Sequence, residues 1–585
     1  MLIMKSINKI IASALVVGMG LVSTACVGDL DLTPQNPTTF TWADVEKNPD
    51  LYLPQVFNKC YSVYAVSGQN GEGSADLGGM DPGKSCYQRA MFMLNEKCTD
   101  ECAWLYTEDG VDNIVKGSWT SGHGLVYGCY SRLYVIIAIC NDFLRQTAAS
   151  GIDLTTSKTE LNNVAQYQRE VRALRAMAYY NVLDMWGNAG WVDETVEYGT
   201  NPTPIKRIDL YNKIVADLKD VIANWPENLK PEYGRVGLDG VKMLLAKIYL
   251  NAKVYTDGAV DGYADCLALC NEIIANHKGS GFKGSGLANH YHALFSANND
   301  RYMPGGSAAG ENEIIWGVPY ENTYIHAYGG TRYLMAAGMG NGTAASRADV
   351  DLAKGTFYMA CSDYGINDQW GCMHARQQFS EKFIDNGDVR DNLWSKEREG
   401  FTIENTDYSK FNNGYAAIKF TNLLTKEDGS FYLIDDTAPV DMTNIDAASK
   451  ALSGNIHPDT DLPIFRLADV YLMKAECFVL GGQGDKTSAL EAVNYVRERA
   501  GVVKWNDNEL NAESLLDERA RELYWENHRR SDLVRFGKFT SGYNWAWKGG
   551  VLNGKDIPAY ETVYPIPASV IAAQPEFAAF QNKGY

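Results

Sequence analysis

The sequence predicts a mainly α-helical protein, in which a tetratricopeptide-like scaffold of helical hairpins presents a large, irregular, loop-rich part with a few short strands. Three observations support this fold class. Apolar residues recur with helical spacing in several long blocks. Two long regions between these blocks are instead rich in Gly, Asn, Asp and aromatic residues, with little periodicity. The chain has 585 residues, 45% hydrophobic and 21% charged, which is a globular composition with ample material for a core.

The first 25 residues have the layout of a secretory signal peptide. A basic start without acids is followed by an apolar run over 10–22 and by small residues before Cys26. This run is too short to cross a membrane, which takes about 20 apolar residues. The arrangement resembles a bacterial lipobox, although Ser23 stands where Leu is usual. We therefore expect Cys26 to become a lipidated N-terminus and 27–37 to act as a flexible leash; a plain signal peptide cut elsewhere is the alternative.

The helical blocks follow the chain in two groups. They lie at 162–186, 208–224, 239–255, 263–277, 464–480, 486–500 and 512–527. The pair 239–255 and 263–277 carries small residues where two helices touch, and it resembles a tetratricopeptide unit, a stacking helical hairpin of about 34 residues. The scaffold is thus predicted at about 125–280 and 457–540, with loop-rich regions at about 66–124 and 281–456. Loops this long inside a compact domain are usually functional.

The overall charge restricts the partners. The formal net charge is −19, which disfavours nucleic acid and anionic lipid headgroups. The chain also has 35 Tyr and 13 Trp, a composition that suits recognition of neutral ligands through aromatic faces but equally fills cores. No second long apolar stretch that could span a membrane is expected.

The cysteines and histidines predict neither a metal site nor a cofactor. There are twelve Cys, so setting Cys26 aside leaves an odd number, and at least one thiol is free or pairs outside the chain. Cys98 and Cys102 could close a small loop, which the sequence leaves open. With only eight His and no paired C-x-x-C motif, a zinc site is not expected.

The sequence contains no catalytic motif in a context that would support catalysis. The stretch GGMDPGKS (78–85) matches the phosphate-binding loop pattern, but the residues before it form no strand, so we interpret the match as chance. Neither G-x-S-x-G nor H-E-x-x-H occurs. Asp100 and Glu101 are adjacent carboxylates, and neighbours on an extended chain point to opposite sides, so they cannot form a facing acid and base.

A row of acidic residues near the C-terminus is interpreted as structural. Glu518, Glu522 and Glu526 recur every four residues on one predicted helix face, near Arg519, Arg529 and Arg530. Such a pattern predicts a structural ion-pair network rather than catalysis. Trp186 and Trp525, which lie inside periodic helices, are predicted to be core residues.

Six segments in a fixed order carry a resemblance to a known family. They are CVGDLDLTPQNP, REVRALRAMAYYNVLDMWG, FRLADVYLMKAECFVLGG, AVNYVRERAGV, ERARELYWENHRRSDLVRFGKF and YPIPASVIAAQPEFAAFQNKGY. Together they resemble the SusD/RagB family, surface lipoproteins that sit beside a TonB-dependent outer-membrane transporter and help to capture nutrients, mostly glycans. The segments run from residue 26 to 585. The sequence departs from the family pattern at Asn527, Arg530, Phe536 and Lys583, all in scaffold segments.

The resemblance implies one SusD-like domain over 26–585 without catalytic activity. It implies a cell-surface lipoprotein in the outer membrane of a Gram-negative bacterium, anchored in lipid through acylated Cys26 and partnered by a SusC-like TonB-dependent transporter. It also implies that ligand contacts come from the loop regions. TDECAW (99–104) and QWGCMHARQQFSEKF (369–383) resemble loops close to the binding face of the family.

The ligand candidates follow from sugar chemistry, since sugar rings stack on flat aromatics and their hydroxyls bind polar groups. The aromatic candidates are Trp104, Tyr106, Trp119, Tyr324, Tyr328 and Trp370, and the polar candidates are Arg89, Asp100 and Glu101. Core packing is the alternative role for each aromatic, and a solvated loop charge is the alternative for each polar residue. Two other functions stay open: the same scaffold could bind a peptide or another nutrient, or act mainly as the lid of the transporter.

Overall fold

The computed structural model describes residues 40–68, 70–106, 108–308, 311–338, 365, 366, 368, 370–383, 387–393, 395, 396, 401–429 and 456–585. The expected signal peptide, Cys26 and the leash over 27–37 lie outside the described residues, as does much of the second loop-rich region. The helices before residue 280 are α2 (Trp42–Lys47), α3 (Pro49–Ala65), α4 (Pro82–Ser85), α5 (Tyr87–Asn95), α6 (Val111–Lys116), α7 (Gly124–Ser150), α8 (Val164–Met185), α9 (Arg207–Ala223), α10 (Leu238–Leu250), α11 (Ala252–Tyr255) and α12 (Tyr263–His277). Those that follow are α13 (Thr331–Gly338), α14 (Gln377–Ser380), α16 (Leu467–Val479), α17 (Lys486–Arg499), α18 (Ala512–Leu523), α19 (Arg529–Arg535) and α20 (Ala568–Ala573).

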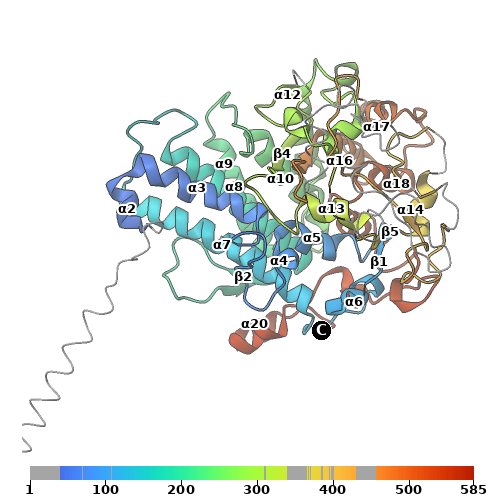
Figure 1. The fold of residues 1–585 in the computed structure, drawn as a ribbon, viewed down its shortest axis with the longest axis horizontal. Helices are drawn as coiled ribbons and strands as arrows, with labels where there is room; N and C mark the ends of the chain where they lie inside the picture. The colour runs from blue at the N-terminus through green and yellow to red at the C-terminus, as the bar shows by residue number, and fades with distance from the viewer. Residues whose placement is uncertain are drawn as a thin grey trace, which may run out of the picture.

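The scaffold is a curved array in which each long helix packs on the next. Helix α7 packs on α8, α8 on α9, α9 on α10, α10 on α12, α12 on α16, and α16 on α17 (Figure 1). This confirms the mainly helical fold and the hairpin scaffold. Local sequence fixes the helix starts: the side chains of Asn163, Asp485 and Asn511 accept backbone N–H bonds at the first turns of α8, α17 and α18.

The scaffold extends further toward the N-terminus than predicted, and the first loop-rich region contains a helix. Helix α3 packs on α7 and α8, although it precedes the predicted scaffold. Helix α5 lies inside the predicted loop region 66–124 and is buried along its whole length. Its sequence, YQRAMFMLN, spans only nine residues, too few to establish a helical period, and its polar residues Gln88, Arg89 and Asn95 are buried as well.

Helix α7 also meets the length and hydropathy expected of a membrane span. The most apolar 18-residue stretch within Gly124–Ala149 has a mean hydropathy of 1.3, which contradicts the expectation that no second apolar stretch exists. Within the described structure, 61% of this stretch is buried, and the helix packs against α3, α5 and α8. A central core helix explains this composition.

Three small antiparallel sheets tie distant segments together. β1 (Cys102–Trp104) pairs with β5 (Met373–Ala375), which pairs with β6 (Tyr415–Ala416). β2 (Ala189–Trp191) pairs with β3 (Thr203–Ile205), and β4 (Ile314–Val318) pairs with β7 (Leu462–Arg466). The predicted helix at 464–480 is therefore wrong at its start: residues 462–466 form a strand, because β4 offers a partner edge, and α16 begins only at Leu467.

Buried ion pairs join the loop-rich part to the helical scaffold. Glu522 on α18 accepts hydrogen bonds from Arg466 at 2.9 Å, Arg499 at 2.6 Å and Arg390 at 3.2 Å. Glu313, which precedes β4, accepts from the same Arg466 and Arg499, each at 2.8 Å. All five side chains are buried. They come from the end of α17, from α18, from the end of β7, from the residue before β4 and from the loop around residue 390.

The predicted ion-pair network exists, but most of its pairs do not join residues that are neighbours in the sequence. Glu518 pairs with Arg390, Arg497 and Arg521, and Glu526 pairs with Arg466 and Lys419. Arg519 instead binds Asp469 and Asp532, Arg529 binds Asp100, and Arg530 binds Asp184. Of these pairs, only Arg521 and Glu518 lie on the same helix turn. The other pairs form through tertiary contacts, which sequence spacing does not show.

Ten of the twelve Cys fall within the described residues, and all ten are buried and free. The possible Cys98–Cys102 loop closure therefore does not form, and the Cys98 thiol instead donates to the carbonyl of Leu94. Trp186 and Trp525 are buried, as predicted.

The network generates a stability prediction. Glu522→Gln keeps the size of the side chain but leaves Arg466, Arg499 and Arg390 without one counter-charge, so we expect the free energy of unfolding to fall by about 3–5 kcal/mol. Glu513→Gln, on the exposed start of the same helix, should stay within about 0.5 kcal/mol of the parent. Urea unfolding of the soluble protein measures both, and equal stability of the two variants would contradict a supporting role for Glu522.

Candidate functional site

The β1–β5 pairing brings candidates from the two loop regions together. Trp104 lies opposite Met373 in the sheet register, so Tyr106 and Trp370 lie just beyond it. The Tyr106 hydroxyl donates to the backbone carbonyl of Trp370 at 3.3 Å. Tyr106 is 41% exposed and Trp370 is partly buried, with its indole N–H donating to Asp368 at 3.0 Å. Both aromatic side chains therefore border the surface.

Trp104 and Arg89 lie beneath this surface. Trp104 is 1% exposed, and the Nζ atom of buried Lys97 lies 3.2 Å from its ring centroid. Burial lowers the pKa of Lys97 well below its usual value, and the nearby charge of Arg89 lowers it further. Arg89 stacks on Tyr333 at 4.8 Å and on Trp370 at 5.5 Å. Trp104 is thus a core residue here, contrary to its expected ligand contact, while Arg89 supports Trp370 from below.

Asp100 and Glu101 are also interior residues. Asp100 binds Arg529 at 2.6 and 2.7 Å and accepts from the Tyr543 hydroxyl at 2.8 Å. Burial alone raises the pKa of its carboxyl, but Arg529 outweighs burial and holds the pKa well below its usual range. Glu101 accepts the backbone N–H of Trp525 at 3.1 Å. Neither carboxylate has a surface for a ligand in this structure, because each holds the C-terminal segment to the first loop region.

Trp119 lies apart from the other candidates. It is buried, its ring lies 4.7 Å from that of Tyr564 in a tilted contact, and its indole N–H donates to the hydroxyl of the C-terminal residue Tyr585 at 2.7 Å. It therefore anchors the C-terminus and does not contact a ligand surface in this structure.

Tyr324 and Tyr328 lie on the loop that follows β4. Tyr324 is 87% exposed, and Tyr328 is partly buried beneath the guanidinium of Arg332, which lies 4.4 Å from its ring. Arg332 in turn binds Asp368, the hydrogen-bond acceptor of Trp370. A continuous line of contacts therefore runs from Tyr328 through Arg332 and Asp368 to Trp370 and Tyr106. We call Tyr106, Tyr324, Tyr328 and Trp370 the aromatic strip.

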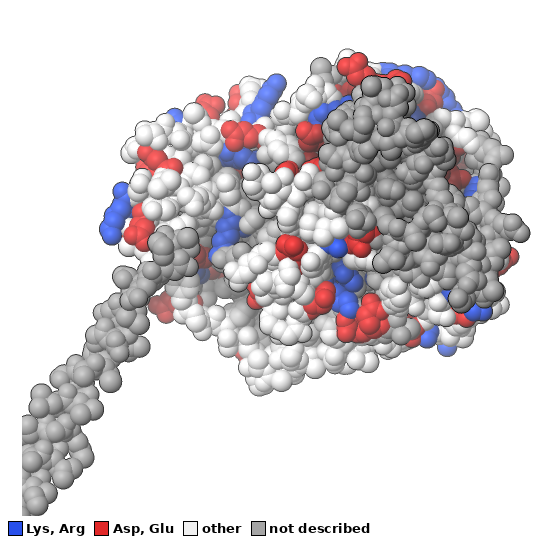
Figure 2. Space-filling model, in the orientation of Figure 1, with Lys and Arg blue, Asp and Glu red and all other residues white. Residues whose placement is uncertain are grey.

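A groove adjoins the Tyr324 end of the strip. It has a volume of about 550 Å³ and lies between the end of α3, the loop after it, β4 and residues 324–326. Aromatic residues on its wall include Tyr61, Tyr233 and Trp316. The Arg235 guanidinium at its edge is paired with Glu170 at 2.6 Å, and the lining also includes Glu72 and His326. On the face drawn in Figure 2, basic and acidic residues are interspersed.

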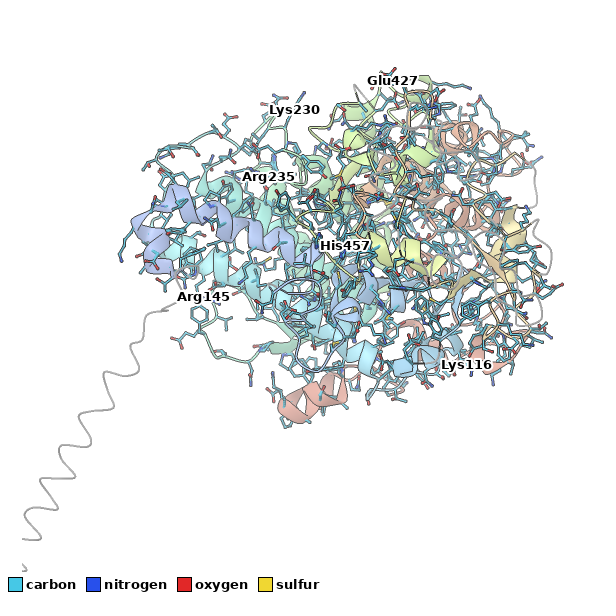
Figure 3. The ribbon with its side chains drawn as sticks, viewed as in Figure 1. Lys116, Arg145, Lys230, Arg235, Glu427 and His457 are labelled. Atoms are coloured by element: carbon cyan, nitrogen blue, oxygen red, sulfur yellow. The ribbon has the colours of Figure 1, made fainter. Side chains whose placement is uncertain are left out.

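Three residues that sequence reasoning did not select meet beside the strip: Glu72, His326 and His457. The rings of His326 and His457 stack at 4.1 Å with 5° between their planes, and Tyr328 stacks on the His457 ring at 5.9 Å. Figure 3 places His457 near the middle of the molecule. Burial, followed by Arg332 and His326, lowers the pKa of His457 to about 4. No sequence motif links positions 72, 326 and 457, so only the fold reveals this cluster.

The phosphate-loop pattern at 78–85 does not form a nucleotide site. Its last four residues are the single turn α4, and the Asp81 carboxylate accepts the N–H of Lys84 at 3.0 Å, where a phosphate oxygen would sit. Lys84 itself binds Asp109. The interpretation of this match as chance is consistent with this geometry.

Comparison with known proteins assigns the family. The SusD family profile matches residues 441–585. Starch-binding protein SusD of Bacteroides thetaiotaomicron is 31% identical over 607 aligned positions, which cover 99% of each chain. The chain belongs to the SusD family.

Other SusD family members extend this picture. SusD-like protein P25 of Formosa agariphila is 24% identical over 70% of this chain and 69% of its own length. A SusD superfamily protein of Parabacteroides distasonis superposes with a TM-score of 0.62 at 20% identity, covering 94% of this chain and all of the other. Surface glycan-binding protein A of Bacteroides thetaiotaomicron, solved in complex with laminarihexaose, gives a TM-score of 0.59 at 18% identity over 91% of this chain and 99% of its own. These likenesses confirm the SusD-like fold.

Buried Glu96 and Glu101 generate a pH prediction. Burial raises both pKa values, that of Glu101 from 4.5 to about 7 although Arg529 opposes the shift, and the charge of Glu101 raises the pKa of Glu96 further. The folded protein therefore retains a proton that the unfolded chain releases near pH 4.5. The stability that this proton contributes is present at pH 4.5 and is lost as the pH rises to about 7, by about 3 kcal/mol at most.

Glu96→Gln tests this assignment. Its amide N–H replaces the shared proton, so we expect this variant to lose less stability than the parent between pH 5 and pH 8 in urea unfolding. Glu46→Gln, on the exposed face of α2, should keep the pH dependence of the parent. If Glu96→Gln also keeps it, the two carboxyl groups do not share a proton.

Proposed function

We propose that this chain is a non-catalytic, cell-surface glycan-binding lipoprotein that captures oligosaccharide or polysaccharide and delivers it to a partner TonB-dependent transporter. The observation that carries the proposal is the aromatic strip: four aromatic side chains from three loop segments are exposed or partly buried, and Tyr324 also lines a groove. The full-length similarity to a starch-binding protein and the fold shared with a protein solved with laminarihexaose support a glycan as the ligand.

The strip suits sugars for a physical reason. Aromatic faces stack on the C–H faces of sugar rings, and polar groups between them serve the hydroxyls. Asp368 and Arg332 lie between Tyr328 and Trp370 and already bind each other, so they offer hydrogen bonds without a net charge. A neutral, hydroxyl-rich ligand fits this arrangement better than a charged peptide.

The anchor and the partner complete the proposal. Acylation of Cys26 would hold the chain on the outer membrane, where more than one acyl chain gives firm attachment. Tethering beside a transporter raises the effective concentration of the captured ligand, so single-site affinity in the micromolar to millimolar range, roughly −8 to −4 kcal/mol, is sufficient.

Substitutions along the strip test ligand contact. Tyr324→Ala and Trp370→Ala should each weaken glycan binding several-fold, because stacking contributes about 0.5–1.5 kcal/mol per contact beyond area burial. Calorimetric titration with maltooligosaccharides and laminarihexaose, after a wider glycan screen, measures the effect. Tyr198→Ala, a 62% exposed tyrosine of the helical part, is the matched control and should bind normally. Normal binding by both strip variants would place the ligand elsewhere.

Trp104→Ala separates packing from binding. Trp104 is fully enclosed, so its truncation should lower the free energy of unfolding by about 3–5 kcal/mol. Tyr324→Ala should leave the melting temperature unchanged. If the Trp104→Ala variant is as stable as the parent but binds glycan more weakly, Trp104 contacts the ligand and the core assignment is wrong.

Absence of hydrolysis is a separate expectation. Asp100 and Glu101 are internal, and along the strip Asp368 is held by Arg332 and by the Trp370 indole, so none of these is placed as a free catalytic acid. Prolonged incubation of pure protein with a bound glycan should release no new reducing ends. A time-dependent increase that survives repurification would overturn the non-catalytic assignment.

A further inference from the structure

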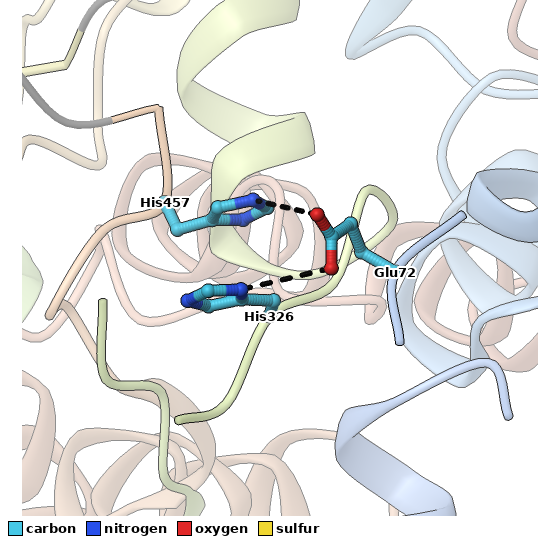
Figure 4. Close-up of side chains that lie close together, drawn as sticks. All are labelled: Glu72, His326 and His457. Atoms are coloured by element: carbon cyan, nitrogen blue, oxygen red, sulfur yellow. Dashed lines mark ion pairs between the residues drawn. The ribbon is translucent and has the colours of Figure 1, made fainter. Parts of the chain in front are cut away.

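The cluster of Glu72, His326 and His457 joins three parts of the chain that are far apart in sequence. Glu72 lies in the loop after α3, His326 in the loop after β4, and His457 a few residues before β7. In Figure 4 the two imidazole rings are stacked, and the carboxylate of Glu72 faces the nitrogen-bearing edges of both. One ligand atom from each residue lies within 4.8 Å of the other two.

Direct bonding among the three groups does not explain the arrangement. His326 Nδ1 lies 3.6 Å from one Glu72 oxygen, and His457 Nε2 lies 3.8 Å from the other. Both distances exceed a hydrogen bond. Around a tetrahedral zinc ion, with bonds of about 2.0–2.2 Å, neighbouring ligand atoms are about 3.3–3.6 Å apart. The two distances from Glu72 are therefore slightly wider than in a filled site, and the two stacked rings must rotate out of their parallel arrangement for both lone pairs to meet one ion.

The hydrogen bond made by His326 directs its other ring nitrogen toward the cluster. His326 Nε2 lies 2.5 Å from the backbone carbonyl of Asn322. A carbonyl only accepts, so Nε2 carries a proton, and in the neutral ring Nδ1 presents its lone pair toward Glu72. A ligating histidine whose other nitrogen donates to a carbonyl is the usual arrangement around protein-bound metals.

His457 supplies the second, independent observation. Its side chain is 6% exposed, yet among the described residues neither of its ring nitrogens makes a hydrogen bond. A buried imidazole in this condition carries a desolvation cost that a bound ion removes. The neighbouring Arg332 guanidinium does not add a net positive charge to the site, because it is paired with Asp368.

We propose that Glu72, His326 and His457 form a binding site for a divalent transition-metal ion of the zinc class. Two imidazoles and one carboxylate are the donor set that such ions prefer, whereas Mg²⁺ and Ca²⁺ prefer oxygen donors alone. Three protein ligands leave a fourth position for water. The ion ties the loop that carries Tyr324 and Tyr328 to the segments around residues 72 and 457, a role that goes beyond glycan capture and contradicts the sequence-based expectation of no metal.

The test uses the soluble mature chain from residue 27 onward, stripped with chelator. We expect titration calorimetry to show one tight Zn²⁺ site per chain, and Zn²⁺, but not Mg²⁺ or Ca²⁺, to raise the melting temperature. Co²⁺ should give the visible absorption of a tetrahedral nitrogen and oxygen site without thiolate charge transfer, which distinguishes this cluster from the buried cysteines. Thiolate absorption, or no saturable site, would overturn the proposal.

Variants assign the ligands. Glu72 and His326 are partly exposed, so Glu72→Gln and His326→Ala should keep the fold of the metal-free chain. Each substitution should weaken Zn²⁺ affinity at least tenfold. His277→Ala is the matched control: His277 lies 3.3 Å from Asp239 and so forms a His–carboxylate pair, which should not affect the tight site. If Glu72→Gln and His326→Ala bind Zn²⁺ like the parent, or if His277→Ala loses the site, the assignment is wrong.

Discussion

The ion pairs between Glu522 and three arginines are the constraint on which the rest of the structure depends. Arg466 ends β7, Arg499 ends α17, and Arg390 belongs to the second loop-rich region, so a single carboxylate joins two scaffold elements and one loop. Exposed ion pairs contribute little, but a buried one must be complete, because an unpaired charge in the interior is strongly destabilising. The loops around residues 313 and 390 can therefore adopt few positions relative to the helices. This is how a helical scaffold fixes segments that have almost no secondary structure of their own.

The candidate site depends on that placement. The pairing of β1 with β5 is only three residues long, yet it sets Tyr106 beside Trp370 across more than 260 positions of sequence. Arg89 then packs under Trp370, and Arg332 with Asp368 continues the line to Tyr328. Each of these cations is itself stacked on or paired with a neighbour. The aromatic strip thus lies on a layer of stacked and paired cations, which holds its side chains in place.

The sequence predicted the scaffold well because helices leave a local signature. Blocks such as 208–224 and 263–277 became α9 and α12 almost to the residue, since each exposes one face and buries the other. Where a helix is short, the signature is too brief to recognise: α5 has only nine residues and was predicted as loop. Strand β7 was missed because five residues acquire strand geometry only through β4. The site was predicted in part for a similar reason. An aromatic residue in an irregular segment looks the same whether it ends inside, as Trp104 and Trp119 do, or outside, as Tyr324 does. The cluster of Glu72, His326 and His457 has no local signal at all.

Energetic scale explains why the loops need so many restraints. One aromatic–sugar contact contributes about 0.5–1.5 kcal/mol beyond area burial, judged by aromatic pairs. Ordering one flexible side chain on binding costs about as much. A strip of four aromatics on unrestrained loops would therefore gain almost nothing, because the ordering cost would cancel the stacking. The restraints come from scaffold ion pairs, the short β1–β5 sheet, the Arg332–Asp368 bridge and, in our proposal, a metal ion at His326. Together they order the loops before the ligand arrives, so even weak stacking remains as net affinity.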